Sequence, residues 1–349
     1  MSAQPFDTEQ AAAHHLLIVP ADVLPQDLEV LATSRFSTAG WDEQPEATAG
    51  RRGRAKAGPT MALRLSRHST LFGPYALDRA ATSALGVQAP SGQAWVLHAP
   101  VERGDAPWPG ASDRDGLGRA FPAGIPVRDE ERVVLWMIAV ARRLGGAVRI
   151  TSGERGPATV LVPDPAAAVD LTVWTDIWLE PEATLSVVRQ AIPRARLDVG
   201  RPWHGPPAGT GAIPVIGAAD LDADARAALH AAADTHDLGV LANPEPMTGY
   251  GVLANLDLDG MLAVQVFGEP EPPQALAGVP WAKNGAIAYR VTWEPDELTD
   301  LGMERPPIEH RVARGRSAPL VNAIARAVHA HVAGEITDMM GFIVDPADL

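Results

Sequence analysis

The pattern of hydrophobic and polar positions in the first part of the chain predicts short elements on either side of a linker. Apolar runs predict a strand over His15–Pro20 and a helix over Pro25–Ala32. Between residues 39 and 60 the apolar pattern is lost and small, polar and proline residues dominate, which is typical of a flexible linker. Alternation resumes at Met61–Leu65. We therefore expect an N-terminal segment, 1–38, and a linker, 39–60, ahead of the main body.

The strongest helix pattern lies in the middle of the chain. Asp129 is expected to cap it, acidic residues follow in its first turn, arginines fill its last turn, and Gly145 ends it. Its middle, Val133–Val140, is apolar on every side, which predicts burial on most sides. The preceding stretch, 99–127, follows the predicted strand Ala94–His98 and lacks a clear pattern. Loops of that length in a compact domain are uncommon and often functional or disordered.

Two hairpins are predicted on either side of the centre. Ala147–Thr151 and Ala158–Val162 flank a turn with two glycines, and Tyr250–Leu256 and Met261–Phe267 flank an Asp-Leu-Asp-Gly turn. The remaining patterns in the second half predict further elements, namely a strand over Ala212–Ile216, a helix over Asp220–Thr235 and a last helix over Pro319–Ala333 capped by Ser317.

Two strand-to-helix corners resemble each other. The long strand Asp170–Leu179 leads into Glu180-Pro181-Glu182, and the strand Ala286–Trp293 leads into Glu294-Pro295-Asp296. A proline among acidic residues is a common helix start. Aligning Glu180 with Glu294 gives the hypothesis of an internal repeat of about 105–115 residues. The alternative is that generic capping chemistry produces both corners.

Together these patterns predict an α+β fold of two sheet-and-helix halves with mainly antiparallel strands, with internal duplication as a hypothesis. The expected halves are 61–200 and 201–349. Each half is expected to resemble a split β-α-β arrangement, and that analogy implies no activity.

Charge and cysteine content narrow the function classes. The formal net charge of −14 disfavours nucleic acid and anionic membranes as partners, because both carry phosphate charge. The absence of cysteine excludes thiolate nucleophiles, thiolate zinc sites and iron–sulfur clusters. The N-terminus has no signal-peptide pattern and no apolar run is long enough to cross a bilayer, so the expected location is the cytoplasm.

The strand around Trp174 and Trp178 is the first candidate binding site. Strict alternation places Trp174, Asp176 and Trp178 on one face. Two indoles on either side of a carboxylate could stack a ligand and accept its hydrogen bonds. The alternative is that the tryptophans pack in the core and Asp176 pairs with an arginine. With Arg290, these residues are the expected ligand-binding set.

The long loop supplies a second candidate, because loops on a scaffold often carry binding groups. Its candidate residues are Asp105, Trp108, Asp113, Arg114, Asp115 and Arg119. The alternative is a solvated loop. The sequence contains no metal-binding histidine spacing, no complete calcium loop, no phosphate-binding loop and no Gly-x-Ser-x-Gly motif. No metal or cofactor is therefore expected.

Two function hypotheses follow. The leading one is a non-enzymatic protein that binds a small molecule or a protein partner in a groove between the halves, or that forms a homo-oligomer there. The alternative is a hydrolase or transferase using carboxylate general acid–base catalysis, with Asp176 or Glu180 as the acid and Arg290 as the anion holder. The enzyme hypothesis requires a pocket that brings these groups within hydrogen-bond reach.

Overall fold

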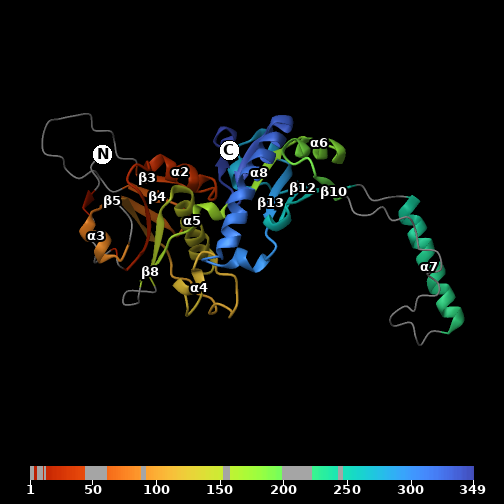
Figure 1. The fold of residues 1–349 in the computed structure, drawn as a ribbon. Coiled ribbons are helices and arrows are strands. Elements are labelled where there is room, and N and C mark those ends of the chain that lie inside the picture. Colours follow the sequence, from red (N-terminus) through yellow and green to blue (C-terminus); the bar gives the residue numbers. More distant parts are fainter. Residues whose placement is uncertain are drawn as a thin grey trace.

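The computed structural model describes residues 4–5, 11, 13–43, 61–87, 92–151, 158–198, 222–242 and 247–349. Within these residues the chain forms two mainly antiparallel sheets with helices packed on them. The sheets lie side by side, and helices α5 and α8 lie between them (Figure 1). The α+β class with two sheet-and-helix halves is therefore confirmed.

The first sheet runs in the order β3-β4-β5-β6-β2-β7-β8, with β1 parallel to β5 at its side. Its strands are β1 (Gln4–Pro5), β2 (His15–Pro20), β3 (Gly40–Glu43), β4 (Met61–Arg64), β5 (Thr70–Leu77), β6 (Gly92–His98), β7 (Ala147–Thr151) and β8 (Ala158–Leu161). Strands β2 and β3 belong to this sheet, although residues 15–20 lie in the predicted N-terminal segment and residues 40–43 in the predicted linker. In β2, Leu17 faces one core and Leu16 the other, which buries both faces of the strand.

The helices of the first half are α2 (Pro25–Thr33), α3 (Arg79–Ala84), α4 (Leu117–Ala120) and α5 (Arg128–Leu144). Helix α5 is buried along its apolar middle, as its pattern predicts, and Gly145 ends it with a φ of 67°. Asp129 does not cap it, because the N-cap is Val127. The Asp129 carboxylate instead accepts hydrogen bonds from the hydroxyls of Ser66, at 2.7 Å, and Ser69, at 2.6 Å.

The second sheet runs in the order β10-β11-β12-β13-β9-β14-β15. Its strands are β9 (Leu171–Thr175), β10 (Arg196–Asp198), β11 (Gly249–Asn255), β12 (Met261–Glu269), β13 (Ala286–Glu294), β14 (Glu335–Asp338) and β15 (Ile343–Val344). Both predicted hairpin pairings, β7 with β8 and β11 with β12, are confirmed.

The helices of the second half are α6 (Pro181–Ala191), α7 (Ala223–Ala242) and α8 (Ile308–Val332). Helix α8 starts well before the predicted Pro319, which lies inside it, and Ser317 is fully buried within the helix instead of capping it. The segment after Glu294 forms a 3₁₀ turn, η6 (Leu298–Gly302), where an α-helix was expected. The predicted strand Ala212–Ile216 lies outside the described residues.

The two sheets share one strand order when their strands are numbered along the chain. With β1 left out of the count, the first strand of each sheet, β2 or β9, lies between the fifth and sixth strands. The last long helix of each half, α5 or α8, joins those two strands. The alignment of Glu180 with Glu294 superposes β9 on β13, its neighbour in the same sheet, and so does not relate one sheet to the other. Duplication stays a prediction.

The division between the sheets differs from the expected halves. It falls between β8 and β9, so β9 belongs to the second sheet although it lies within 61–200. Helix α7 stands apart from both sheets in Figure 1, and it carries two large exposed hydrophobic side chains, Leu229 and Leu238. Among the described helices, none combines the length and the apolar character needed to cross a membrane.

Candidate functional site

The tryptophan face predicted from the sequence is not formed. Trp174 is buried against Leu276 and Ala288, and its indole N–H donates to Thr337 Oγ1 at 2.9 Å. Trp178 packs with the opposite core, edge-on to Tyr250 with the ring centroids 5.4 Å apart. The two indoles therefore lie on different sides of the sheet and cannot stack on one ligand.

The end of β9 at Thr175 explains this difference. The Thr175 hydroxyl donates to the carbonyl oxygen of Val332 at 2.9 Å and accepts the backbone N–H of Ile177 at 3.2 Å. This local turn competes with the extended ladder. Beyond Thr175 the period-two alternation no longer applies, so Asp176 and Trp178 do not continue the face that Trp174 occupies.

The residues of the acid–base hypothesis lie apart. Asp176 is exposed beside an open cavity of about 430 Å³ next to Gly285. Glu180 is exposed at the start of α6. The guanidinium of Arg290 lies 5.0 Å from the centre of the Phe267 ring. Among the described residues, no hydrogen bond or ion pair joins Asp176, Glu180 and Arg290 to one another.

The long loop, residues 99–127 of the first half, makes hydrogen bonds with the second half. The backbone N–H of Asp113 donates to the carbonyl oxygen of Gly302 at 2.9 Å. Arg119 donates to both carboxylate oxygens of Glu304, at 2.6 and 3.2 Å. Asp105 and Trp108, by contrast, are exposed. Asp105 and Trp108 are therefore exposed to solvent, whereas Asp113 and Arg119 lie at the junction, the region where the two halves are in contact.

The β14–β15 hairpin extends from the second sheet into the core of the first half. Phe342 is only 1% exposed and belongs to the same hydrophobic cluster as Leu28 and Trp136. Arg143 of α5 donates to Asp338 at 3.2 Å and to the carbonyl oxygen of Ile343 at 3.1 Å. Apolar packing and hydrogen bonds together hold the two halves in contact.

A cleft of about 170 Å³ lies at this junction. Arg114 and Asp115 reach it from the first half, and Asp170, Asp300 and His310 reach it from the second. A more open groove of about 670 Å³ shares Arg114 and Asp115 with it and continues along the loop. A cleft at a boundary between halves is a common location for small-molecule sites.

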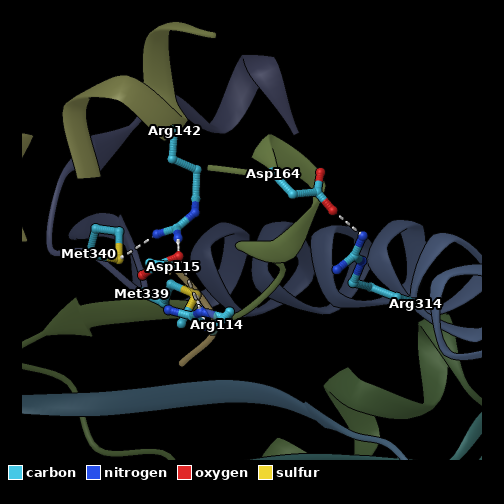
Figure 2. Close-up of polar contacts among 7 residues, drawn as sticks. All are labelled: Arg114, Asp115, Arg142, Asp164, Arg314, Met339 and Met340. Carbon is cyan, nitrogen blue, oxygen red and sulfur yellow. Dashed lines mark hydrogen bonds and ion pairs between the residues drawn. The ribbon is translucent and has the colours of Figure 1, made fainter. Parts of the chain in front are cut away.

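Most charged groups around the cleft are already paired. Figure 2 shows Arg142 extending from α5 to Asp115 and to the sulfur of Met340, which lies 3.5 Å from Nη1. It also shows Arg314 of α8 donating to Asp164 at 2.5 Å. These ion pairs offset the desolvation cost of charged groups that are partly buried where the two halves meet.

His310, Asp170 and Asp300 are less completely paired. The side chain of His310 is 3% exposed, yet its Nδ1 makes no hydrogen bond, and the nearby Oδ2 of Asp300 lies 3.8 Å away. Burial lowers the pKa of His310, and Arg314 lowers it further. Burial raises the pKa of Asp170, whose Oδ1 accepts the backbone N–H of Trp293 at 3.0 Å. Shifted pKa values in a cleft favour a functional site.

A further cavity, of about 380 Å³, lies in the first half and is lined in part by the buried Glu130. Glu130 accepts from His15 Nε2 at 3.1 Å and from the backbone N–H of Glu102 at 2.7 Å, and it pairs with Arg103. His15 Nδ1 accepts the backbone N–H of Thr151 at 3.1 Å. Because the imidazole and the carboxylate are satisfied from within the protein, we interpret this cluster as structural.

Acidic pH is expected to destabilise the protein through His15. Burial, with Arg103 and Arg149 nearby, lowers its pKa to about 4, while the unfolded value is about 6.5. Between these values the unfolded chain binds a proton that the native chain does not, so stability falls as the pH drops from about 6.5 to about 4. The total loss is about 3 kcal/mol. Urea unfolding across this window measures it.

The control for this prediction is His15→Gln, which keeps a donor and an acceptor but does not titrate. Its stability is expected to depend less steeply on pH over the same window. Equal slopes in His15→Gln and the wild type would mean that His15 is not the group responsible.

No cluster of three or more potential metal ligands occurs in the part of the chain that the structure describes. Comparison of the chain with protein-family models, with curated proteins and with solved structures finds no match.

The sequence contained a signal for His310 that the prediction missed. Pro306-Pro307, followed by Glu309, is the pattern of a helix start, and it marks the true beginning of α8. With the helix started there, His310 falls in its first turn. Nothing in the local pattern, however, indicates that Asp300 and Asp170 lie close to it.

Proposed function

We propose that this protein binds a small polar molecule in the cleft between its two halves and is not an enzyme. The observation that supports the proposal most strongly is the Nδ1 of His310, which is buried at the cleft without a hydrogen bond. An unsatisfied buried polar group costs about 1–3 kcal/mol. A ligand that supplies the missing partner would recover that free energy, whereas the paired groups around it gain nothing from a ligand.

The acid–base alternative receives less support. Asp176 lines a cavity that neither Glu180 nor Arg290 lines. General acid–base catalysis needs its groups within hydrogen-bond reach of one reacting centre. Binding requires only the complementary groups that the cleft already presents.

The proposal is tested by a thermal-shift screen of small neutral, anionic and cationic polar compounds against the wild type and His310→Leu. A compound present at 100 times its Kd is expected to stabilise the wild type by about 2.7 kcal/mol. The variant is expected to lose that stabilisation. Without ligand it should be at least as stable as the wild type, because leucine removes an unsatisfied polar group from a buried position.

The matched control is His331→Leu. His331 is exposed and lies at the other end of the same helix from His310. It is expected to respond to ligands as the wild type does. If no compound stabilises the wild type, or if every stabilising compound acts equally on His310→Leu, the proposed site is wrong.

A further inference from the structure

Hydrogen-bond acceptors in the cleft outnumber the donors available to them. Asp170 uses Oδ1 for the backbone N–H of Trp293, which leaves Oδ2. Within the described residues, the Asp300 carboxylate makes no hydrogen bond, and its Oδ2 lies 3.8 Å from His310 Nδ1. Burial and Arg314 lower the pKa of His310, while Asp300 raises it, and an imidazole that carries its proton on Nε2 offers Nδ1 as an acceptor. Asp170, Asp300 and, in that tautomer, His310 therefore offer three acceptors in the lining of the cleft.

The charges around the cleft favour a cation. Five acidic side chains line it against two arginines, and two further arginines pair with these acids from outside the lining. Five acidic side chains and four arginines give this group of residues a formal charge of −1. Arg314 is engaged by Asp164 at 2.5 Å, while Arg114 lies 3.8 Å from Asp115 and 3.8 Å from the sulfur of Met339. Figure 2 shows the Arg114 side chain lying beside Asp115 and Met339.

The adjoining groove has a different character. Leucines and a methionine line it alongside the backbone of the loop, namely Leu117, Leu298, Leu301 and Met303. A ligand whose polar head occupies the cleft can therefore place an apolar substituent along the groove, where burial of apolar surface is favourable.

From these three observations we infer that the cleft selects a primary amine with a small apolar substituent, its ammonium group bound by Asp170, Asp300 and His310. This inference rests on the proposed function. An ammonium group has three donors and no acceptor, which matches three acceptors in a cleft with excess negative charge. Its hydrogen bonds to the carboxylates are charge-assisted and therefore stronger than neutral ones.

The test compares three probes of one shape and different charge, benzylamine, benzyl alcohol and benzoate, by isothermal titration at neutral pH and low salt. Benzylamine is expected to bind about tenfold or more tightly than benzyl alcohol, the effect of one charge-assisted hydrogen bond. Benzoate is expected to bind more weakly than either, because it meets unpaired carboxylates.

Two variants locate the binding. Asp300→Asn is expected to weaken benzylamine about tenfold or more and to leave benzyl alcohol nearly unchanged. It should fold normally, because the Asp300 carboxylate makes no hydrogen bond with any residue that the structure describes. Asp345→Asn removes an acid that caps a turn near the C-terminus, outside the cleft, and is expected to leave benzylamine affinity as in the wild type.

Equal affinity of the wild type for benzylamine and benzyl alcohol would overturn the amine inference, as would tighter binding of benzoate. In those cases the proposed function stands, provided that His310→Leu abolishes binding of the preferred probe. If Asp300→Asn leaves benzylamine affinity unchanged, the inference also fails. If none of the three probes binds, the inference fails and the broader screen then decides the proposed function alone.

Discussion

Replacing Phe342 by alanine is expected to destabilise the protein by about 3–5 kcal/mol, the usual cost of deleting a buried phenylalanine ring. Phe342 is 1% exposed and lies in the core of the first half, although the hairpin that carries it belongs to the second sheet. The substitution therefore leaves a cavity in one half and weakens its contact with the other. Urea unfolding of the variant and the wild type measures the loss.

Ile343→Ala is the matched control, because Ile343 is the next residue on the same hairpin and is 37% exposed. It is expected to cost clearly less than Phe342→Ala, since more than a third of the Ile343 surface is exposed and a smaller side chain is removed. If the two variants lose the same stability, Phe342 does not contribute as a buried contact between the halves.

Replacing Arg142 by methionine is expected to cost about 3–5 kcal/mol, the range for removing one partner of a buried ion pair. The Arg142 side chain is 2% exposed and pairs with Asp115, which is 15% exposed. Methionine fills much of the space but leaves the Asp115 carboxylate with only Arg114, whose Nε lies 3.8 Å away. The loss is measured by urea unfolding at neutral pH.

The neighbouring Arg143→Met provides the control. The Arg143 side chain is 34% exposed and its distance to Asp338 is 3.2 Å, so its loss is expected to cost about 1 kcal/mol or less. Adding Asp115→Leu to Arg142→Met should recover most of the stability, because no charge then stays buried without a partner. If the double variant is less stable than Arg142→Met, the pair is not the source of the effect.

Local patterns predicted most of the framework. Alternation and turn residues identified both hairpins, and the apolar middle of α5 predicted its burial. Local patterns also led to errors where tertiary contacts dominate. The carboxylate of Asp129 is engaged by Ser66 and Ser69 from a distant strand end, and no local rule anticipates this competition for a capping group.

The candidate site was less predictable than the fold. Arg114 and Asp115 of the predicted loop site line the cleft between the halves. Asp170 and His310 were not predicted, because the packing of α8 on the second sheet brings them to the same cleft. The tryptophan strand shows the opposite case. Its side chains alternate between the two faces of the sheet up to Thr175. The strand ends there, where the Thr175 hydroxyl donates to the carbonyl oxygen of Val332 at the end of α8. The side chain of Trp178 then turns to the other core.

The most direct test of the account follows the imidazole nitrogens of His310 by NMR in histidine-labelled protein during titration with benzylamine. The account predicts that the Nδ1 resonance of His310 shifts as this nitrogen accepts a hydrogen bond, while the resonances of His15, whose two nitrogens are already bonded within the protein, stay in place. A saturating titration that leaves His310 Nδ1 unchanged would contradict the account.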